Sequence, residues 1–165
     1  MPPNIKTISI DGQISGTINN LIGKNLTLTT GTVTKILGNV NVVNITDPSN
    51  FNINISNAKV TTNINDIAIF YAPILNVAKP NIKALGIVNF NGNAIIKAKS
   101  YEANGFLSTA LGNINLNGSY MFNNGLPKYN GTLATNSFAL GKFLNDSKLG
   151  EINLDATIAG TGLAR

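Results

Sequence analysis

The chain contains neither cysteine nor histidine in its 165 residues, so it has no thiol or imidazole for catalysis or for a zinc site. Seven carboxylates remain as acid–base groups, and their spacing forms no motif of paired catalytic acids. They are Asp11, Asp47, Asp66, Glu102, Asp146, Glu151 and Asp155. The sequence therefore predicts no enzyme, no metal site and no cofactor.

Basic residues exceed acidic ones and give a net charge of +5, which raises the question of nucleic-acid binding. Eleven of the twelve basic residues are lysines spread along the chain, and the arginine is the terminal Arg165. Bidentate arginine contacts to phosphates or bases are thus missing, and no nucleic-acid partner is predicted. The densest group, Lys79, Lys83, Lys97 and Lys99, fits either a solvated face or contact with anionic lipid headgroups.

The strongest pattern is the alternation of apolar and polar residues from Leu111 to Phe122. Ile114, Leu116 and the residues that follow them at even positions are apolar or glycine, whereas the odd positions 113 to 119 are asparagine or serine. Because successive side chains in a strand point to opposite faces, this pattern predicts a strand with one apolar and one polar face.

A short unit, Gly-x-[Ile/Val]-Asn-apolar, occurs four times, beginning at Gly38, Gly86, Gly112 and Gly150. The spacings of 48, 26 and 38 residues are too irregular for a solenoid and fit a sheet with connections of varying length. We therefore predict a single all-β domain over residues 1–165: an extended, curved, mostly antiparallel sheet that forms an open hydrophobic trough. The alternative is a β-sandwich, in which the same apolar face packs against a second sheet.

Several local patterns predict the boundaries of strands. From 8 to 18 the even positions are isoleucine or glycine and the odd positions are polar, which favours one long strand over a hairpin turning at Asp11-Gly12. The glycines at 12 and 16 leave gaps in the apolar face of this strand. The segment 47–50 is a turn cluster, and the change of parity at Asn57-Ala58 predicts a bulge or a turn.

Further along, Asn91-Gly92-Asn93 and the segment 123–127 are predicted to be turns. Asp66 is expected to cap a short helix over 67–71 that Pro73 ends, and the spacing of apolar residues predicts a second helix over 138–144. A final strand over 152–162 has no capping element after it.

Asparagine occupies 28 positions, although strands normally disfavour it. A genome-wide amino-acid bias explains this more simply than an asparagine-specific function. Amyloid-like asparagine tracts are the rival, and the regular alternation favours a packed sheet.

The first residues lack the basic and apolar segments of a signal peptide, and the longest apolar run, 67–75, is too short to span a bilayer. The absence of cysteine is compatible with a periplasmic compartment. We therefore expect this chain to be an internal part of a longer protein.

The segment 131–162 resembles the TamB-like branch of the AsmA-type family, especially its Bacteroidetes-like members. The matching motifs are Tyr129-x-Gly131, Phe138-x-Leu140-Gly141-Lys142-Phe143-Leu144, Leu149-Gly150 and Gly160-x-Gly162. The beginning of the chain is similar as well, with Ile10-x-Gly12-x-Ile14-x-Gly16-Thr17-Ile18 and Gly23-Lys24-x-Leu26.

The resemblance implies a segment of a long periplasmic protein of the translocation and assembly module type, whose parent is anchored in the inner membrane. Its sheet would form an open hydrophobic trough, or β-taco, that carries phospholipid toward the outer membrane. Through parts outside this segment the parent would assist outer-membrane biogenesis with a barrel assembly protein.

The aliphatic residues of the alternating strands are the candidate lining of such a groove, because a lipid path needs an uncharged aliphatic row backed by a polar face. These candidates are Ile8, Ile10, Ile14, Ile18, Ile114, Leu116, Ile152, Leu154 and Ile158. An exposed apolar face and an uncovered final strand also predict self-association. The alternative function is that of a structural β protein of a surface adhesin.

Overall fold

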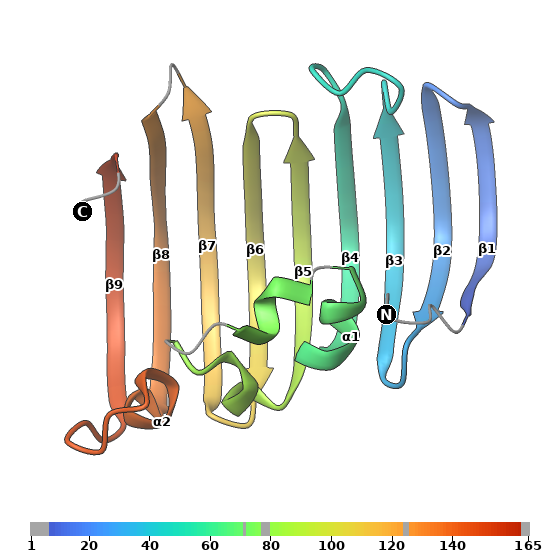
Figure 1. Cartoon of the computed structure of the whole chain (residues 1–165). Helices are drawn as coiled ribbons and strands as arrows, with labels where there is room; N and C mark the ends of the chain where they lie inside the picture. Colours follow the sequence, from blue (N-terminus) through green and yellow to red (C-terminus); the bar gives the residue numbers. More distant parts are fainter. Residues whose placement is uncertain (1–6, 71, 77–79, 124–125, 163–165) are drawn as a thin grey trace.

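The computed structural model describes residues 7–70, 72–76, 80–123 and 126–162. In this part of the chain, nine strands form one antiparallel sheet whose spatial order follows the sequence (Figure 1). The strands are β1 (Ile8–Thr17), β2 (Asn20–Thr30), β3 (Thr34–Val43), β4 (Asn52–Asn63), β5 (Ile87–Lys97), β6 (Ser100–Thr109), β7 (Gly112–Asn123), β8 (Leu126–Phe138) and β9 (Ile152–Thr161). The predicted all-β, antiparallel, open sheet is confirmed. The β-sandwich alternative is wrong, because the described residues contain no second sheet.

Long strands are a general feature of this sheet, each with 10 to 13 residues. β1 runs without a turn through Asp11-Gly12, which confirms the long strand. It ends one residue before Ile18, which lies in the turn to β2. Gly12 and Gly16 are both exposed, and a side chain there would meet the neighbouring strand: Leu26 at Gly12 and the Asn20 carbonyl at Gly16.

Three bulges interrupt the sheet, in β2, β4 and β8. At each bulge one extra residue adopts a left-handed conformation: Asn25 (φ 51°), Asn57 (φ 53°) and Ser137 (φ 51°). The amide of each extra residue donates a hydrogen bond to the side-chain oxygen of an asparagine on the next strand, at 2.7 to 3.1 Å. These asparagines are Asn39, Asn93 and Asn153. Part of the asparagine content thus satisfies backbone groups that a bulge leaves unpaired.

Short helical segments occupy the two longest connections. α1 (Ile64–Phe70), η1 (Ala72–Asn76) and η2 (Ile82–Leu85) join β4 to β5, and α2 (Leu140–Leu144) joins β8 to β9. They gather at one end of the sheet, with the β4–β5 connection lying across one face (Figure 1). The helix predicted over 138–144 is confirmed at Leu140–Leu144.

Asp66 does not have the predicted role of a helix cap. α1 begins at Ile64, and the side chain of Asn63 accepts the hydrogen bond from the Asp66 amide. The Asp66 carboxylate instead accepts hydrogen bonds from the amides of Thr32, Val33 and Thr34 in the turn between β2 and β3. Position 71, the predicted end of this helix, lies outside the described residues.

Two predicted turns differ from the structure. β5 passes straight through Asn91-Gly92-Asn93, and the turn falls at positions 98 and 99. Gly92 lies directly opposite Gly105 with the Phe90 ring beside both, so close packing between strands explains this glycine. In the predicted turn 123–127, residues 124 and 125 lie outside the described residues, whereas 123 ends β7 and 126 and 127 belong to β8. The predicted turn 47–50 and the bulge at Asn57 are confirmed.

The sheet encloses little core. The buried hydrophobic side chains of the described residues are Ala58, Ala68, Leu111 and Phe138, and no large side chain there is fully buried. Many large apolar side chains are exposed instead, among them Ile14 at 60%. No helix in the described part of the chain is both long and apolar enough to cross a membrane.

Candidate functional site

The strand register shows which residues share a face, because residues directly opposite each other in antiparallel strands lie on the same side. Beside the tight turns at one end of the sheet, one row crosses all nine strands. It consists of Gly16, Leu21, Val42, Ile53, Ile96, Tyr101, Tyr120, Tyr129 and Gly160. The row is free of charged residues, and we call its side of the sheet the apolar face.

The next row on the apolar face is composed of aliphatic and small residues. It runs through Ile14, Gly23, Val40, Ile55, Ala94, Ala103, Gly118, Gly131 and Ile158. From β5 to β8 its members are two alanines and two glycines, with the larger side chains of the tyrosine row on one side. On the other side β7 and β8 carry Leu116 and Leu133, whereas β5 and β6 carry Gly92 and Gly105. Small residues flanked by these larger side chains leave a depression across the strands.

Such a depression is present on β5 to β9, and we call it the apolar hollow. It measures about 480 Å³ and its walls are almost wholly apolar. Its floor is the row of two alanines and two glycines; one wall is the tyrosine row and the other includes Leu116 and Leu133. The rings of Tyr101 and Tyr120 lie 6.1 Å apart, centroid to centroid, at 43°.

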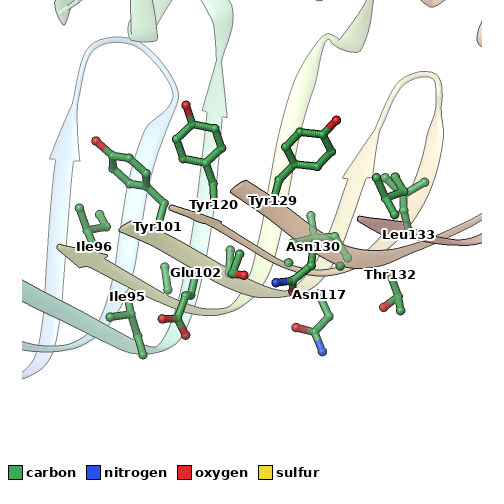
Figure 2. A pocket seen from close by; sticks show the side chains of 17 residues that line it. Ile95, Ile96, Tyr101, Glu102, Asn117, Tyr120, Tyr129, Asn130, Thr132 and Leu133 are labelled. Carbon is green, nitrogen blue, oxygen red and sulfur yellow. The ribbon is translucent and has the colours of Figure 1, made fainter. Parts of the chain in front are cut away.

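Figure 2 shows the two faces of the sheet at this point. The tyrosines, Ile96 and Leu133 rise on one side, while Glu102, Asn117 and Thr132 point to the other. The phenol hydroxyls stand at the outer ends of the rings, away from the ribbon (Figure 2). Tyr101 is 51% exposed, so its ring offers apolar surface to a ligand while its hydroxyl remains in water.

The helical connections cover the opposite end of the same face. By the strand register, Thr34 and Thr62 lie on the apolar face. The Thr34 hydroxyl donates a hydrogen bond to the Asp66 carboxylate at 2.9 Å. Because Asp66 is in α1, this contact places α1 over the apolar face. The structure therefore leaves the end with the tyrosine row open and partly covers the other end.

The carboxylate of Asp66 is almost entirely buried, with 3% of its residue surface exposed. Burial acts to raise the pKa of this carboxyl, but hydrogen bonds from three backbone amides and the Thr34 hydroxyl outweigh it and hold the pKa far below the ordinary value. Asp66 thus accepts these hydrogen bonds as a charged carboxylate and fastens α1 to the β2–β3 turn.

The predicted groove residues fall into three groups. Leu116 and Ile158 line the apolar hollow. Ile8, Ile10, Ile14, Ile114, Ile152 and Leu154 share the apolar face outside the hollow. Ile18 lies in the turn after β1, so its assignment to the sheet face is wrong. Asn113 and Asn115 are exposed, as the alternation of residues in this strand predicts for its polar face.

The predicted lysine group does not form one patch. Lys83 is in η2, before β5, whereas Lys97 ends β5, which is 11 residues long and so spans about 35 Å. Lys99 follows Lys97 in the turn to β6, and Lys79 lies outside the described residues. A pair of lysines therefore remains near the tyrosine row.

Sequence reasoning missed the tyrosines and the small residues of the floor. Their signal is a repeated pairing of tyrosine with alanine or glycine two positions away, seen in Tyr101/Ala103, Gly118/Tyr120 and Tyr129/Gly131. A spacing of two places both members on one face of a strand, so three adjacent strands with this pair build a wall beside a floor.

Within the described residues, no cluster of three or more metal-ligating side chains is found. The fold and the hollow define a class of protein: an open single sheet whose apolar face is uncovered at the end that carries the tyrosine row. No protein-family model, no curated protein and no solved structure matches this chain.

Proposed function

We propose that the apolar face is a segment of a periplasmic groove that conducts phospholipid between the inner and outer membranes. The parent would be anchored in the inner membrane and would support outer-membrane biogenesis with a barrel assembly protein. The observation that carries the proposal is the apolar hollow on a sheet face that no second sheet covers. The resemblance to the TamB-like family supports it.

The energy of lipid transfer explains why such a face is useful. A sixteen-carbon acyl chain that leaves a membrane exposes apolar surface worth about 13 kcal/mol, at about 0.8 kcal/mol per methylene. Transferring two chains costs roughly 25 kcal/mol, so one uncatalysed escape from the membrane takes on the order of days. A continuous apolar face lowers this barrier by replacing water around the chains.

The size of the hollow fits one acyl chain. Four strand spacings of about 4.8 Å separate β5 from β9, a span of about 19 Å. One fully extended residue contains three backbone bonds and advances about 3.6 Å. By the same measure, the fifteen carbon–carbon bonds of an extended sixteen-carbon acyl chain span about 18 Å. An acyl chain would therefore lie across the strands, along the row of small residues.

The test is photocrosslinking of a phospholipid with a diazirine in its acyl chain to the purified protein. Ile158→Asp places a charge in the hollow, where Ile158 is 46% exposed, and should abolish most crosslinking. Ala159→Asp is the matched control, because Ala159 is exposed on the opposite face beside it, and should crosslink like the unmodified chain.

Circular dichroism of both variants checks that they remain folded. Equal crosslinking of the two folded variants would refute the groove. Mass spectrometry of an organic extract from the natively purified protein should identify phospholipid, whereas a lipid-free chain that binds glycans would favour the adhesin.

A further inference from the structure

One end of the sheet exposes a set of large apolar side chains. The connections β1–β2, β3–β4, β5–β6 and β7–β8 lie at this end, opposite the helical segments (Figure 1). In or beside three of these connections stand apolar residues that are 41% to 64% exposed: Ile18, Ile45, Met121, Phe122 and Leu126. We call this end of the sheet the rim. Exposed apolar residues that gather at one edge mark an interaction surface.

Lysines accompany these apolar residues. Lys97 and Lys99 lie at the β5–β6 turn, and Lys128 lies directly opposite Met121 in the register of β7 and β8; all three lysines are exposed. Basic and apolar side chains adjoin here, because Lys97, Lys99 and Phe122 line one hollow of about 500 Å³ in the rim. The rim is therefore both apolar and basic.

The net charge of the rim is positive. In the described part of this end, the acidic residues are Asp47, in the β3–β4 connection, and Glu102, the third residue of β6. Asp47 accepts hydrogen bonds from the hydroxyl and the amide of Ser49, so its carboxylate is engaged within its own turn. Three ammonium groups thus stand against two carboxylates, and the rim complements an anionic surface.

The order of residues along β7 matches the layers of a membrane interface. Of three consecutive residues, Phe122 is nearest the turn, Met121 follows on the polar face, and Tyr120 belongs to the tyrosine row on the apolar face. Two residues of a strand advance about 7 Å, so Tyr120 and Phe122 differ in height by about that distance. Proteins that lie on membranes bury apolar groups about 5–10 Å deep and keep tyrosine and lysine near the headgroups.

The extent of the rim favours a large, flat partner. Seven strand spacings of about 4.8 Å separate β1 from β8, so the rim spans about 34 Å. Ile18 lies near one end of this span and Leu126 near the other, with Lys97 and Lys99 between them. A small ligand cannot contact both ends at once, whereas a membrane surface can.

We propose that the rim docks on the surface of a membrane that contains anionic lipid. The strands stand on the membrane by their ends: the apolar residues of the rim enter the acyl boundary, the lysines contact lipid phosphates, and the tyrosine row stands at the headgroups. Side chains of both faces of the sheet take part in this contact. The inference goes beyond the proposed function and does not require lipid in the apolar hollow, which the apolar residues and lysines of the rim do not line.

The first experiment is cosedimentation of the whole chain with phosphatidylcholine vesicles, either pure or with one part phosphatidylglycerol to two parts phosphatidylcholine. Each lysine near an anionic surface strengthens binding by about fivefold, so the anionic vesicles should bind roughly a hundredfold more tightly. Lys97→Gln, Lys99→Gln should lose roughly twenty-five-fold of this affinity. Lys142→Gln, Lys148→Gln removes the same charge at the other end of the sheet and should bind like the unmodified chain.

The second experiment locates the contact with tryptophan, which the chain lacks. Phe122→Trp should shift its fluorescence to the blue on anionic vesicles and should be quenched by lipids with brominated acyl chains. Leu149→Trp, in the connection before β9, should show neither change although Leu149 is 43% exposed. Ile10→Trp should also stay unchanged, because Ile10 lies on the apolar face but away from the rim.

The outcomes decide between the rim and other contacts. Absence of binding to anionic vesicles would overturn the inference, and so would equal loss of affinity in the two lysine pairs, since general charge would then be the cause. Quenching of Ile10→Trp as strong as that of Phe122→Trp would mean that the apolar face lies flat on the membrane, and would overturn it as well.

A separate measurement keeps this inference apart from the groove. Lys97→Gln, Lys99→Gln should crosslink a detergent-dispersed diazirine phospholipid as well as the unmodified chain does, because neither lysine lines the apolar hollow. A chain that binds vesicles through the rim without this crosslinking would contradict the groove alone. A chain that crosslinks lipid and ignores anionic vesicles would contradict the rim alone.

Discussion

Replacing Asp66 with asparagine should detach α1 from the β2–β3 turn. The carboxylate accepts hydrogen bonds from the amides of Thr32, Val33 and Thr34 and from two threonine hydroxyls, at 2.8 to 3.1 Å. An asparagine side chain has one acceptor oxygen, and its NH₂ group would face donors. The substitution therefore removes the charge and about half of the acceptor capacity.

The magnitude follows from the number and burial of these bonds. A hydrogen bond to a charged group contributes about 1.5–3 kcal/mol, but the five donors share two oxygens, so their contributions do not add fully. We expect Asp66→Asn to lower the free energy of unfolding by about 3–5 kcal/mol, a large part of the roughly 5–15 kcal/mol typical of a domain. Asp47→Asn, in an exposed turn, should have a small effect by comparison.

Urea unfolding measures the difference, and hydrogen exchange of the amides at 32–34 locates it. Because the folded pKa of Asp66 lies far below its ordinary value of 3.8, the stabilisation should be constant above about pH 5 and should decline as the pH falls below about 4. Unchanged hydrogen exchange of the amides at 32–34 in Asp66→Asn would refute this account. So would a difference in unfolding free energy between the unmodified chain and Asp66→Asn that grows as the pH falls.

Three further predictions concern the sheet. Asn93→Ala removes the acceptor for the bulge amide on β4 and should cost about 1 kcal/mol in urea unfolding, while Asn115→Ala, exposed on the same face, should stay within about 0.5 kcal/mol. Gly92→Ala forces its Cβ against the β6 backbone and should lower the melting temperature by several degrees; Gly150→Ala, with open space around it, should not. Light scattering should detect oligomers of the 17.4 kDa chain that dissociate in mild detergent, and a monomer at all concentrations would contradict this.

Alternation of residue types was a reliable guide to the faces of the strands. The repeated unit marks the start of β5, β7 and β9 at Gly86, Gly112 and Gly150, although Gly38 lies inside β3. The Asn91-Gly92-Asn93 signal failed because local turn preference was outweighed by contact with β6: a side chain at Gly92 would meet the Asn104 carbonyl and the Phe90 ring. Such a contact depends on a partner that the local sequence does not reveal.

The site was harder to predict than the fold for a related reason. Tyr101, Tyr120 and Tyr129 form one row only when the register between β6, β7 and β8 is known. The bulges also shift the parity within a strand, so a residue's face cannot be counted from the strand end alone. The role of Asp66 depends on a turn more than thirty residues earlier in the chain, and a capping motif does not carry that information.

The number of strands also limits how this sheet can be extended. Because the described sheet has nine antiparallel strands, β1 and β9 run in the same direction at its two edges (Figure 1). Placing a translated copy beside β9 would pair it with a β1 in parallel. Antiparallel pairing requires a half-turn about an axis perpendicular to the sheet, which brings β9 against β9. That rotation keeps both apolar faces on one side, so two copies joined in this way would form a single apolar surface of twice the length.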